Sequence, residues 1–294
     1  MILGFRLDRS RTFCLLLILL LAGLMGPTLA DRRRPPKGWT KVGQVEGLLG
    51  TDWYTSKTRT CLAYASGEDL EYVAPVVAGL DTSYEVNANF MGFRAQGPLE
   101  FYFFPMTEPA HTHPKFRSRV GNMSKFAGLA LSGTKICLVN LGSQKNATPF
   151  TTWEIEATSR HEMNHLFAFQ KIRTGGWSWF LEAIAENIEQ TVLPPSSQMG
   201  VNEYKRLLKG YRSEDASWAA LTAERNNNSV DSYRQFGEIL SSIISFLSEK
   251  YGRDAVAKIL RAAPGKSPDE AMKQVFNKDA SQLEAEWKSF YGIR

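Results

Sequence analysis

The sequence contains only one long apolar run, and that run lies at its N-terminus. Residues 13–25 of the 294 are apolar without interruption, arginines precede them, and a small-residue pattern ending at Ala30 follows. This order is typical of a secretory signal peptide that is cleaved after Ala30. The run is shorter than the roughly 20 residues that cross a bilayer, so an uncleaved anchor is the weaker alternative. We therefore expect a soluble mature protein that is exported to the periplasm or the extracellular space.

A net positive charge is found only in the N-terminal part. The formal net charge of the whole chain is +5. Residues 1–30 carry +2 of it, and residues 31–38, the start of a Pro-containing arm at 31–44, carry the other +3, so the rest is neutral overall. The chain lacks the basic face that nucleic-acid binding needs, and we expect no nucleic-acid partner. Arg32, Arg33 and Arg34 in the arm could contact an anionic membrane or wall surface.

Cysteine is also scarce, with three residues in the chain. Cys14 leaves with the signal peptide, and Cys61 and Cys137 remain, both in segments with strand-like patterns. In an oxidising compartment these two can form one disulfide bond, and two buried free thiols are the alternative. The sequence does not give the Cα separation that a disulfide requires, so both alternatives stay open.

Repeats and low-complexity segments are absent, and 43% of the residues are hydrophobic, enough for a substantial core. Residues 45–150 form a strand-rich part. Alternating or apolar patterns predict strands at 53–66 and 98–105 and a hairpin at 125–141. Apolar residues at helical spacing predict one helix within 67–93.

Residues 151–294 have helical patterns throughout. Thr151 and Glu154 have the spacing of a capping box, and the helix that they begin extends to about Arg173. We predict an α+β fold in which a mixed β-sheet lobe precedes a mainly α-helical lobe. The further predicted helices are at 177–192, 201–210, 233–250, 254–262, 268–276 and 279–291.

Only four histidines occur, and two of them form a metal-binding motif. His161-Glu162-Met163-Asn164-His165 lies in the predicted helix and has the form H-E-x-x-H. The two histidines lie on one face, one turn apart, so both can bind one zinc ion, while Glu162 is placed near the metal-bound water. The alternative is an amphipathic helix with two hydrogen-bonded surface histidines.

A hydrolytic zinc site needs a third protein ligand. Glu182 follows in the next predicted helix, which a short turn places antiparallel to the first. Four residues later, Glu186 shares its face and is placed to accept the free ring N–H of a zinc-binding histidine. A solvent-exposed Glu186, or one paired with Lys171 or Arg173, is the alternative.

The sequence HEMNH followed by WFLEAIAENIE resembles the gluzincin pattern of the peptidase MA clan, in which H-E-x-x-H precedes W-x-x-E-G-x-A-x-Y. The resemblance extends from about Trp53 to the C-terminus. It implies a zincin-like fold, one Zn²⁺ ion bound by His161, His165 and Glu182, and Glu162 as the general base. It also implies hydrolysis of peptide bonds in a peptide or protein substrate.

Two positions depart from the family pattern. Ala183 stands where the family usually has Gly, and Asn187 replaces a common aromatic residue. Neither change removes a metal ligand, so the zinc prediction stands while the substrate stays open.

The resemblance further implies a group that stabilises the tetrahedral oxyanion. No histidine follows His165, so a downstream histidine cannot serve here. A tyrosine is expected instead, as in the aminopeptidase branch of the clan. We predict Tyr233 for this role, with Tyr204 and Tyr211 as alternatives.

Two other features stay open. Gly128, Leu129 and Ala130 resemble the edge strand on which these enzymes bind an extended substrate, and an ordinary hairpin is the alternative. His111 and His113 could bind a second metal ion, although a plain loop is the simpler interpretation. The alternative function is a catalytically silent secreted binding protein that keeps zinc as a structural element, and the presence of the expected base argues against it. The oligomeric state is open.

Overall fold

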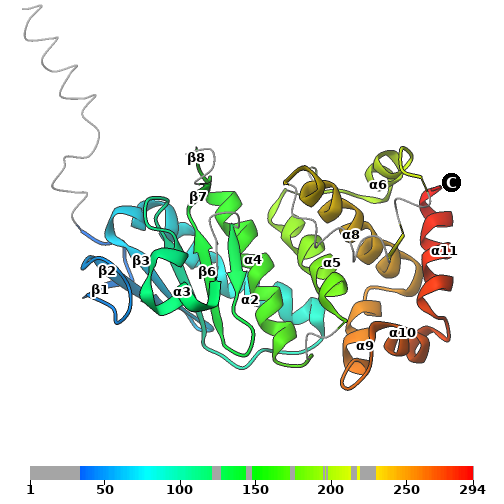
Figure 1. Cartoon of the computed structure of the whole chain (residues 1–294), viewed down its shortest axis with the longest axis horizontal. Helices are drawn as coiled ribbons and strands as arrows, with labels where there is room; N and C mark the ends of the chain where they lie inside the picture. Colours follow the sequence, from blue (N-terminus) through cyan, green and yellow to red (C-terminus); the bar gives the residue numbers. More distant parts are fainter. Residues whose placement is uncertain are drawn as a thin grey trace, which may run out of the picture. The chain divides into compact units, whose positions relative to one another are not determined.

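A six-stranded mixed β-sheet forms one layer of the computed structural model (Figure 1). In order across the sheet, its strands are β1 (Trp39–Gly43), β2 (Trp53–Lys57), β3 (Cys61–Ser66), β4 (Leu99–Phe104), β6 (Ile136–Asn140) and β5 (Gly128–Ala130). The centre is parallel, because β3 pairs with β4 and β4 pairs with β6. The outer strands pair antiparallel and leave β5 at one edge.

The chain from Gly38 onward forms one compact unit. The predicted signal peptide and Arg32 and Arg33 of the arm lie outside the described residues, whereas Arg34 is described and exposed. Among the described residues, no helix is both long and apolar enough to cross a membrane. The structure describes residues 34–120, 127–143, 148–172, 176–194, 196, 198–212, 217–218 and 230–293, with the backbone alone at 143, 148 and 230–236.

Helix α2 (Leu70–Met91) connects the parallel strands β3 and β4 and packs against the sheet. Two parallel strands need such a crossover, since a tight turn cannot join them. Its apolar stripe, which includes Val73 and Val77, is buried as the spacing predicts. Gly92 ends the helix in the left-handed conformation, with φ at 73°, and its N–H donates to the Ala88 carbonyl.

Helix α4 (Thr152–Phe169) lies between the sheet and the helices that follow α4 in the chain (Figure 1). It contacts α2, β5 and β6, and it also contacts α5 (Ser178–Glu189). Thr151 and Glu154 form the predicted capping box at its start. Its last helical residue is Phe169, about one turn before the predicted end.

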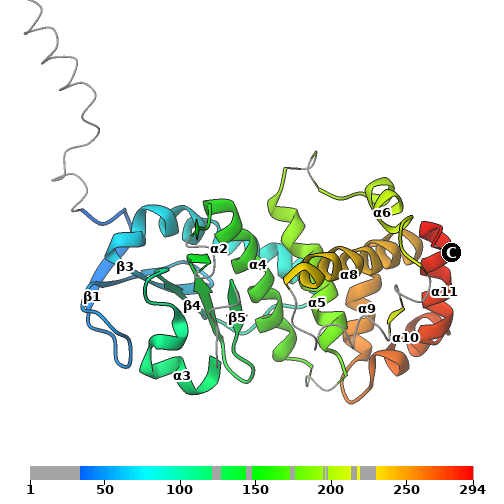
Figure 2. The same ribbon diagram turned by 45° about the horizontal axis from the view of Figure 1, so that its top comes forward.

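The helices after α5 agree with the predicted ranges to within a few residues. Figure 2 shows α5 between α4 and α8, and α5 contacts both. These helices are α6 (Val201–Leu208), α8 (Val230–Tyr251), α9 (Ala255–Ala262), α10 (Pro268–Phe276) and α11 (Ala280–Tyr291). Shorter elements are η2 (Gly67–Asp69), η3 (Ala110–Thr112), α3 (Pro114–Val120), η5 (Gln190–Val192) and a second sheet of β7 (Gly142–Ser143) and β8 (Thr148–Pro149).

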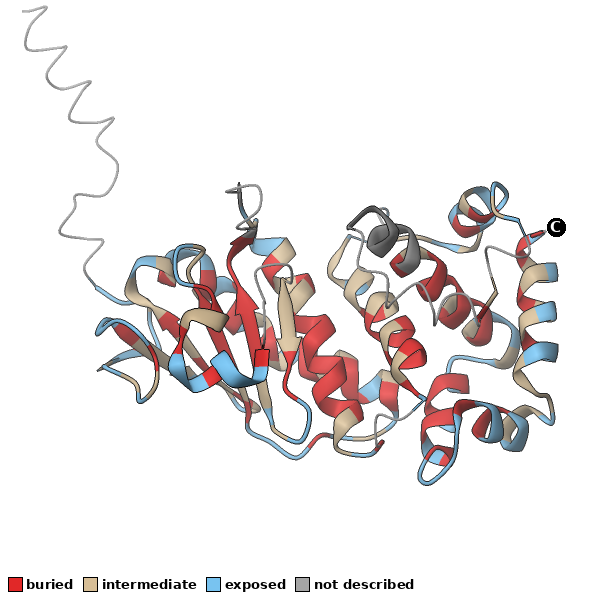
Figure 3. Ribbon diagram, viewed as in Figure 1, coloured by how far each residue is buried: buried red, intermediate tan, exposed pale blue. Residues whose placement is uncertain are grey.

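The middle of α4 is buried although most of its residues are polar (Figure 3). Every residue from Ser159 to Ala168 is buried, including two histidines, a glutamate and an arginine. Buried polar groups need partners, because an unsatisfied one costs about 1–3 kcal/mol. The apolar packing that accounts for α2 therefore does not account for α4.

The N-terminal half differs from the prediction at three places, the first of which is a second helix, α3 (Pro114–Val120), where only one helix was expected. Residues 53–66 form the antiparallel pair β2 and β3 rather than one strand. Asp81 on α2 holds the turn between them, because its carboxylate accepts the backbone N–H groups of Arg59 and Thr60. Strand β1 lies within the stretch expected as an arm and extends the sheet beyond β2.

The two cysteines are buried free thiols, so of the two alternatives the structure has the one without a disulfide. Cys61 lies on β3 and Cys137 on β6, and β4 runs between these strands. Strands are spaced about 4.8 Å apart, and Cys61 pairs with Leu99 whereas Cys137 pairs with Phe101, so the two Cα atoms are more than roughly 9–10 Å apart. A disulfide needs less than about 7 Å.

Candidate metal centre

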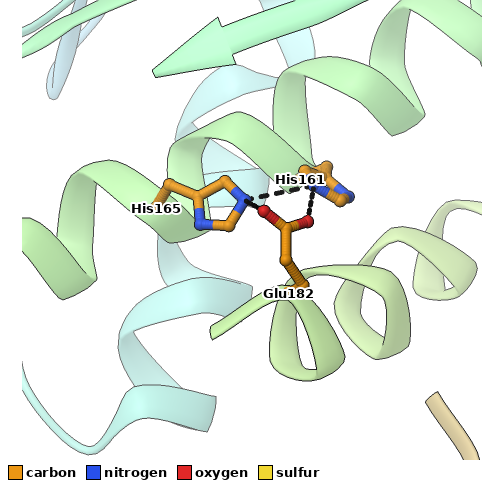
Figure 4. Close-up of side chains that lie close together, drawn as sticks. All are labelled: His161, His165 and Glu182. Carbon is orange, nitrogen blue, oxygen red and sulfur yellow. Dashed lines mark hydrogen bonds and ion pairs between the residues drawn. The ribbon is translucent and has the colours of Figure 1, made fainter. Parts of the chain in front are cut away.

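Two histidines of α4 and one glutamate of α5 bring the ends of their side chains together (Figure 4). The Nε2 atoms of His161 and His165 lie 3.2 Å apart. Each also lies 3.3 Å from a different carboxylate oxygen of Glu182. The three side chains are nearly buried, with 9%, 9% and 12% of their surface exposed. The structure thus brings together the three residues predicted to bind a metal ion.

The spacing of these atoms fits a tetrahedral zinc ion. Zinc binds histidine nitrogen and carboxylate oxygen at about 2.0–2.2 Å, so two ligands of one tetrahedron lie about 3.3–3.6 Å apart. The two histidine nitrogens, 3.2 Å apart, are close to this range, and each lies 3.3 Å from its own Glu182 oxygen, so the carboxylate faces both nitrogens. Three protein ligands leave one corner for water or substrate, which is the composition of catalytic zinc sites.

Hydrogen bonding also favours a cation at this point. His161 Nδ1 lies 3.0 Å from Glu189 Oε2. An ionised carboxylate can only accept, so Nδ1 carries the proton and Nε2 offers a lone pair. That lone pair faces the His165 ring nitrogen and the Glu182 carboxylate, and a single cation satisfies all three groups at once.

In the absence of a metal ion, a proton takes this place. Burial alone lowers the pKa of an imidazole, but hydrogen bonds to Glu182 and Glu189 outweigh it and raise the pKa of His161 well above its usual value. Burial also disfavours the Glu182 anion, yet His165 and His161 hold the pKa of Glu182 well below its usual value. Glu182 is therefore ionised at neutral pH, as a metal ligand must be.

The carboxylate that bonds His161 is Glu189, not Glu186 as the sequence predicted. Glu189 is the last residue of α5, and 34% of its side chain is exposed. It follows Glu182 by seven residues, about two turns, and so shares its helix face. Both candidates share that face, so the spacing alone could have suggested either one. The side-chain conformation decides between them, and the sequence does not give it.

Glu186 lies beside the same cluster in a different environment. Its carboxylate packs over Gly237 of α8, where a Cβ atom would lie only 2.6 Å from Glu186 Oε2. Burial raises the pKa of Glu186 to about 8, which favours its neutral form. Ligand atoms of His161, Glu186 and Glu189 also lie within 4.8 Å of one another. However, His161 Nε2 faces His165 and Glu182 instead. The group with Glu182 is therefore the better metal site.

The edge strand β5 holds the predicted base. The Ala130 N–H donates to Glu162 Oε2 at 2.8 Å. Gly128 permits this approach, because a Cβ atom there would lie 2.6 Å from Glu162 Cγ and 2.7 Å from Thr158 Cγ2. Burial raises the pKa of Glu162, and the two histidines and the Ala130 N–H reduce that shift.

The register of β5 shows which of its backbone groups point outward. The hydrogen bonds to β6 use Ala127 and Leu131, which alternate with Gly128 and Ala130. In an antiparallel ladder, every second residue points its backbone groups away from the partner strand. Gly128 and Ala130 therefore face the outer edge of the sheet, where Glu162 accepts the Ala130 N–H.

The three tyrosines considered for the oxyanion lie in different surroundings. Tyr233 is in α8, but its side chain lies outside the described part of the structure. Tyr204 is fully buried, and its hydroxyl lies 2.6 Å from Ser241 Oγ and 3.0 Å from Gln190 Nε2. Tyr211 packs half-buried against the main core. Tyr204 is thus part of the core rather than of the metal centre.

Of the other two histidines, His113 serves the fold. His113 is fully buried, its Nδ1 accepts the Leu49 N–H at 2.9 Å, and its Nε2 lies 3.0 Å from the Glu108 carbonyl oxygen. Neither His111 nor His113 belongs to a cluster of potential metal ligands within the described residues. The loop interpretation of this pair agrees with the structure.

Comparison with known proteins adds no family assignment. No protein-family model matches the chain, and no curated protein matches it significantly.

Proposed function

We propose that this protein is an exported zinc-dependent metallohydrolase of gluzincin type, with a zincin-like fold, that hydrolyses peptide bonds. The observation that carries the proposal is the convergence of the His161 and His165 ring nitrogens and the Glu182 carboxylate within 3.2–3.3 Å, beside the buried carboxylate of Glu162. The resemblance of HEMNH and WFLEAIAENIE to the peptidase MA pattern supports the same conclusion.

The residues around the site have distinct roles in this proposal. Zinc, when bound, supplies the Lewis acidity that makes water reactive near neutral pH. Glu162 keeps Oε2 on the Ala130 N–H, and its Oε1 takes the proton of the attacking water and passes it to the leaving amine. A raised pKa suits a base that works near neutral pH. Glu189 fixes the orientation of the His161 ring.

The proposed substrate is an extended peptide that lies along β5. The Ala130 N–H is bonded to Glu162, so the outward-facing backbone groups of Gly128 and the Ala130 carbonyl are the ones that can bond to a peptide as a further strand would. This places the peptide beside Glu162, because Glu162 is bonded to the same strand. We propose the Tyr233 hydroxyl as the donor to the oxyanion.

Metal analysis combined with cleavage of a mixed peptide library tests the proposed function. We expect one zinc ion per chain in both the wild type and Glu162→Gln, and cleavage that falls about 10²- to 10⁴-fold in the variant. Equal zinc binding with no cleavage by either protein would support the alternative of a silent binding protein with a structural zinc ion. A wild type that binds no zinc would exclude both functions.

Export is a separate part of the proposal. N-terminal sequencing of the protein recovered from its source should begin at Asp31, if cleavage follows Ala30. A mature chain that still begins with the apolar run would instead indicate an uncleaved anchor.

A further inference from the structure

A second polar cluster lies directly before the first metal ligand in the sequence, and Arg160 is its centre. Arg160 is 5% exposed, and its guanidinium has partners on three elements. Nε donates to Ser83 Oγ of α2 at 3.2 Å, Nη2 to Glu156 Oε1 of α4 at 3.0 Å, and Nη1 to Thr191 Oγ1 of η5 at 2.8 Å. The guanidinium therefore joins two neighbouring helices to the turn that follows α5.

Thr191 lies two residues after Glu189, the carboxylate that bonds His161. Its hydroxyl donates to the Ile188 carbonyl at 2.6 Å and accepts from Arg160. The Thr191 side chain thus fixes the end of α5 internally and attaches it to α4.

Two connections therefore run between the same two segments. Arg160 of α4 bonds to Thr191. Its neighbour His161 bonds to Glu189, at the end of α5. Glu189 is partly exposed, so water competes for its carboxylate, and a long side chain at a helix end loses rotamer freedom when it is held. A second attachment close by reduces that cost.

We infer that Arg160 is a positioning residue for the metal centre: through Thr191 it holds the end of α5 so that Glu189 stays bonded to His161. This inference rests on the proposed zinc function. A planar guanidinium suits the task because it donates in several fixed directions, which a lysine ammonium does not. Burying this cation beside one partly exposed carboxylate is unfavourable by itself, so packing alone does not account for an arginine here.

The zinc dissociation constant, measured by competition with a chromophoric chelator, tests the inference. Thr191→Val and Ser83→Ala each remove one hydroxyl that bonds the Arg160 guanidinium, but only Thr191 lies in the turn beside Glu189. We expect Thr191→Val to weaken zinc binding about 10-fold, the lower end of the effect of losing an outer-shell partner, and Ser83→Ala to change it less than about 2-fold. Thr191→Ser keeps the hydroxyl and should bind as the wild type does.

A double-mutant cycle shows whether the effect passes through Glu189. In the Glu189→Gln background, Thr191→Val should cause no further loss of affinity, because the group that it positions is already altered. Arg160→Lys keeps the charge and loses the planar fork, so it should weaken zinc binding as Thr191→Val does. It serves as the second variant if the Thr191→Val protein fails to fold.

Two outcomes would contradict the role of Arg160 and leave the proposed zinc function standing. One is zinc binding by the wild type with equal effects of Thr191→Val and Ser83→Ala, and the other is additive losses from Thr191→Val and Glu189→Gln. A wild type without zinc affinity instead contradicts the proposed function itself.

Discussion

The four histidines form two pairs that the fold uses in opposite ways. In the first pair, the nitrogens of His113 are occupied by backbone groups of Leu49 and Glu108, so the ring connects two loop segments. In the second pair, the Nε2 atoms of His161 and His165 face each other and a carboxylate. The partners of a buried histidine therefore decide its chemistry. Backbone groups satisfy both ring nitrogens of His113, whereas the lone pairs that converge between His161, His165 and the carboxylate require a cation.

The largest difference between the pairs should appear in zinc affinity. Glu182→Ala removes one of the three proposed ligands, so we expect zinc binding to weaken by more than about 100-fold, the upper limit for an outer-shell partner. His113→Ala should leave the zinc dissociation constant unchanged. Competition with a chelator measures both, and a small effect of Glu182→Ala would exclude it as a ligand.

In the free energy of unfolding, the pair that contains His113 should show the large effect. His113→Ala leaves the Leu49 N–H and the Glu108 carbonyl without their partner and creates a cavity in the core, so we expect about 2–4 kcal/mol less free energy of unfolding. His111→Ala, at the half-buried neighbour, is the control and should cost less than about 1 kcal/mol. Urea denaturation of the metal-free proteins measures this, and equal losses would contradict the structural role of His113.

The two carboxylates near His161 sharpen the comparison within the metal centre. Glu189→Gln changes the group that bonds His161 Nδ1, so zinc affinity should fall about 10- to 100-fold. Glu186→Gln should change it less than about 3-fold, because burial already favours the neutral form of Glu186 at neutral pH. The opposite order would return the role to Glu186, as the sequence predicted.

Asp69, the residue before α2, is a polar group that is partly buried and not fully hydrogen-bonded. Its Oδ2 has no hydrogen-bond partner among the described residues, and burial raises its pKa from 3.8 to about 6. A pKa that is higher in the folded state favours folding below about pH 4, and this contribution is lost as the pH rises through about 6. Asp69→Asn should therefore gain about 1 kcal/mol over the wild type at pH 7 and nothing at pH 4, a figure reduced for the partial exposure of Asp69. Denaturation at both pH values measures it, and an equal difference at both would exclude titration of Asp69 as the cause.

Local patterns predicted most of the elements because their causes are local. The capping box of Thr151 and Glu154 set the start of α4, and the spacing of His161 and His165 placed two ring nitrogens on one face. Which strands neighbour each other is a property of the whole sheet, so the position of β4 between Cys61 and Cys137 could not be read from either segment.

The same limit applies inside the metal centre. The bond between Ala130 and Glu162 depends on how closely β5 passes α4, and the bond between Arg160 and Thr191 depends on how α5 ends. Neither has a signal at fixed spacing in the sequence. The proposed ligands, which lie on two adjacent helices, were accessible to pattern analysis, and the residues that orient them were not.

The most direct test is anomalous diffraction at the zinc absorption edge from crystals of the purified protein. We predict one zinc peak about 2.0–2.2 Å from the Nε2 atoms of His161 and His165 and from a carboxylate oxygen of Glu182. After incubation with zinc, the absence of a peak at that position, or a peak beside His111 and His113 instead, would contradict the account.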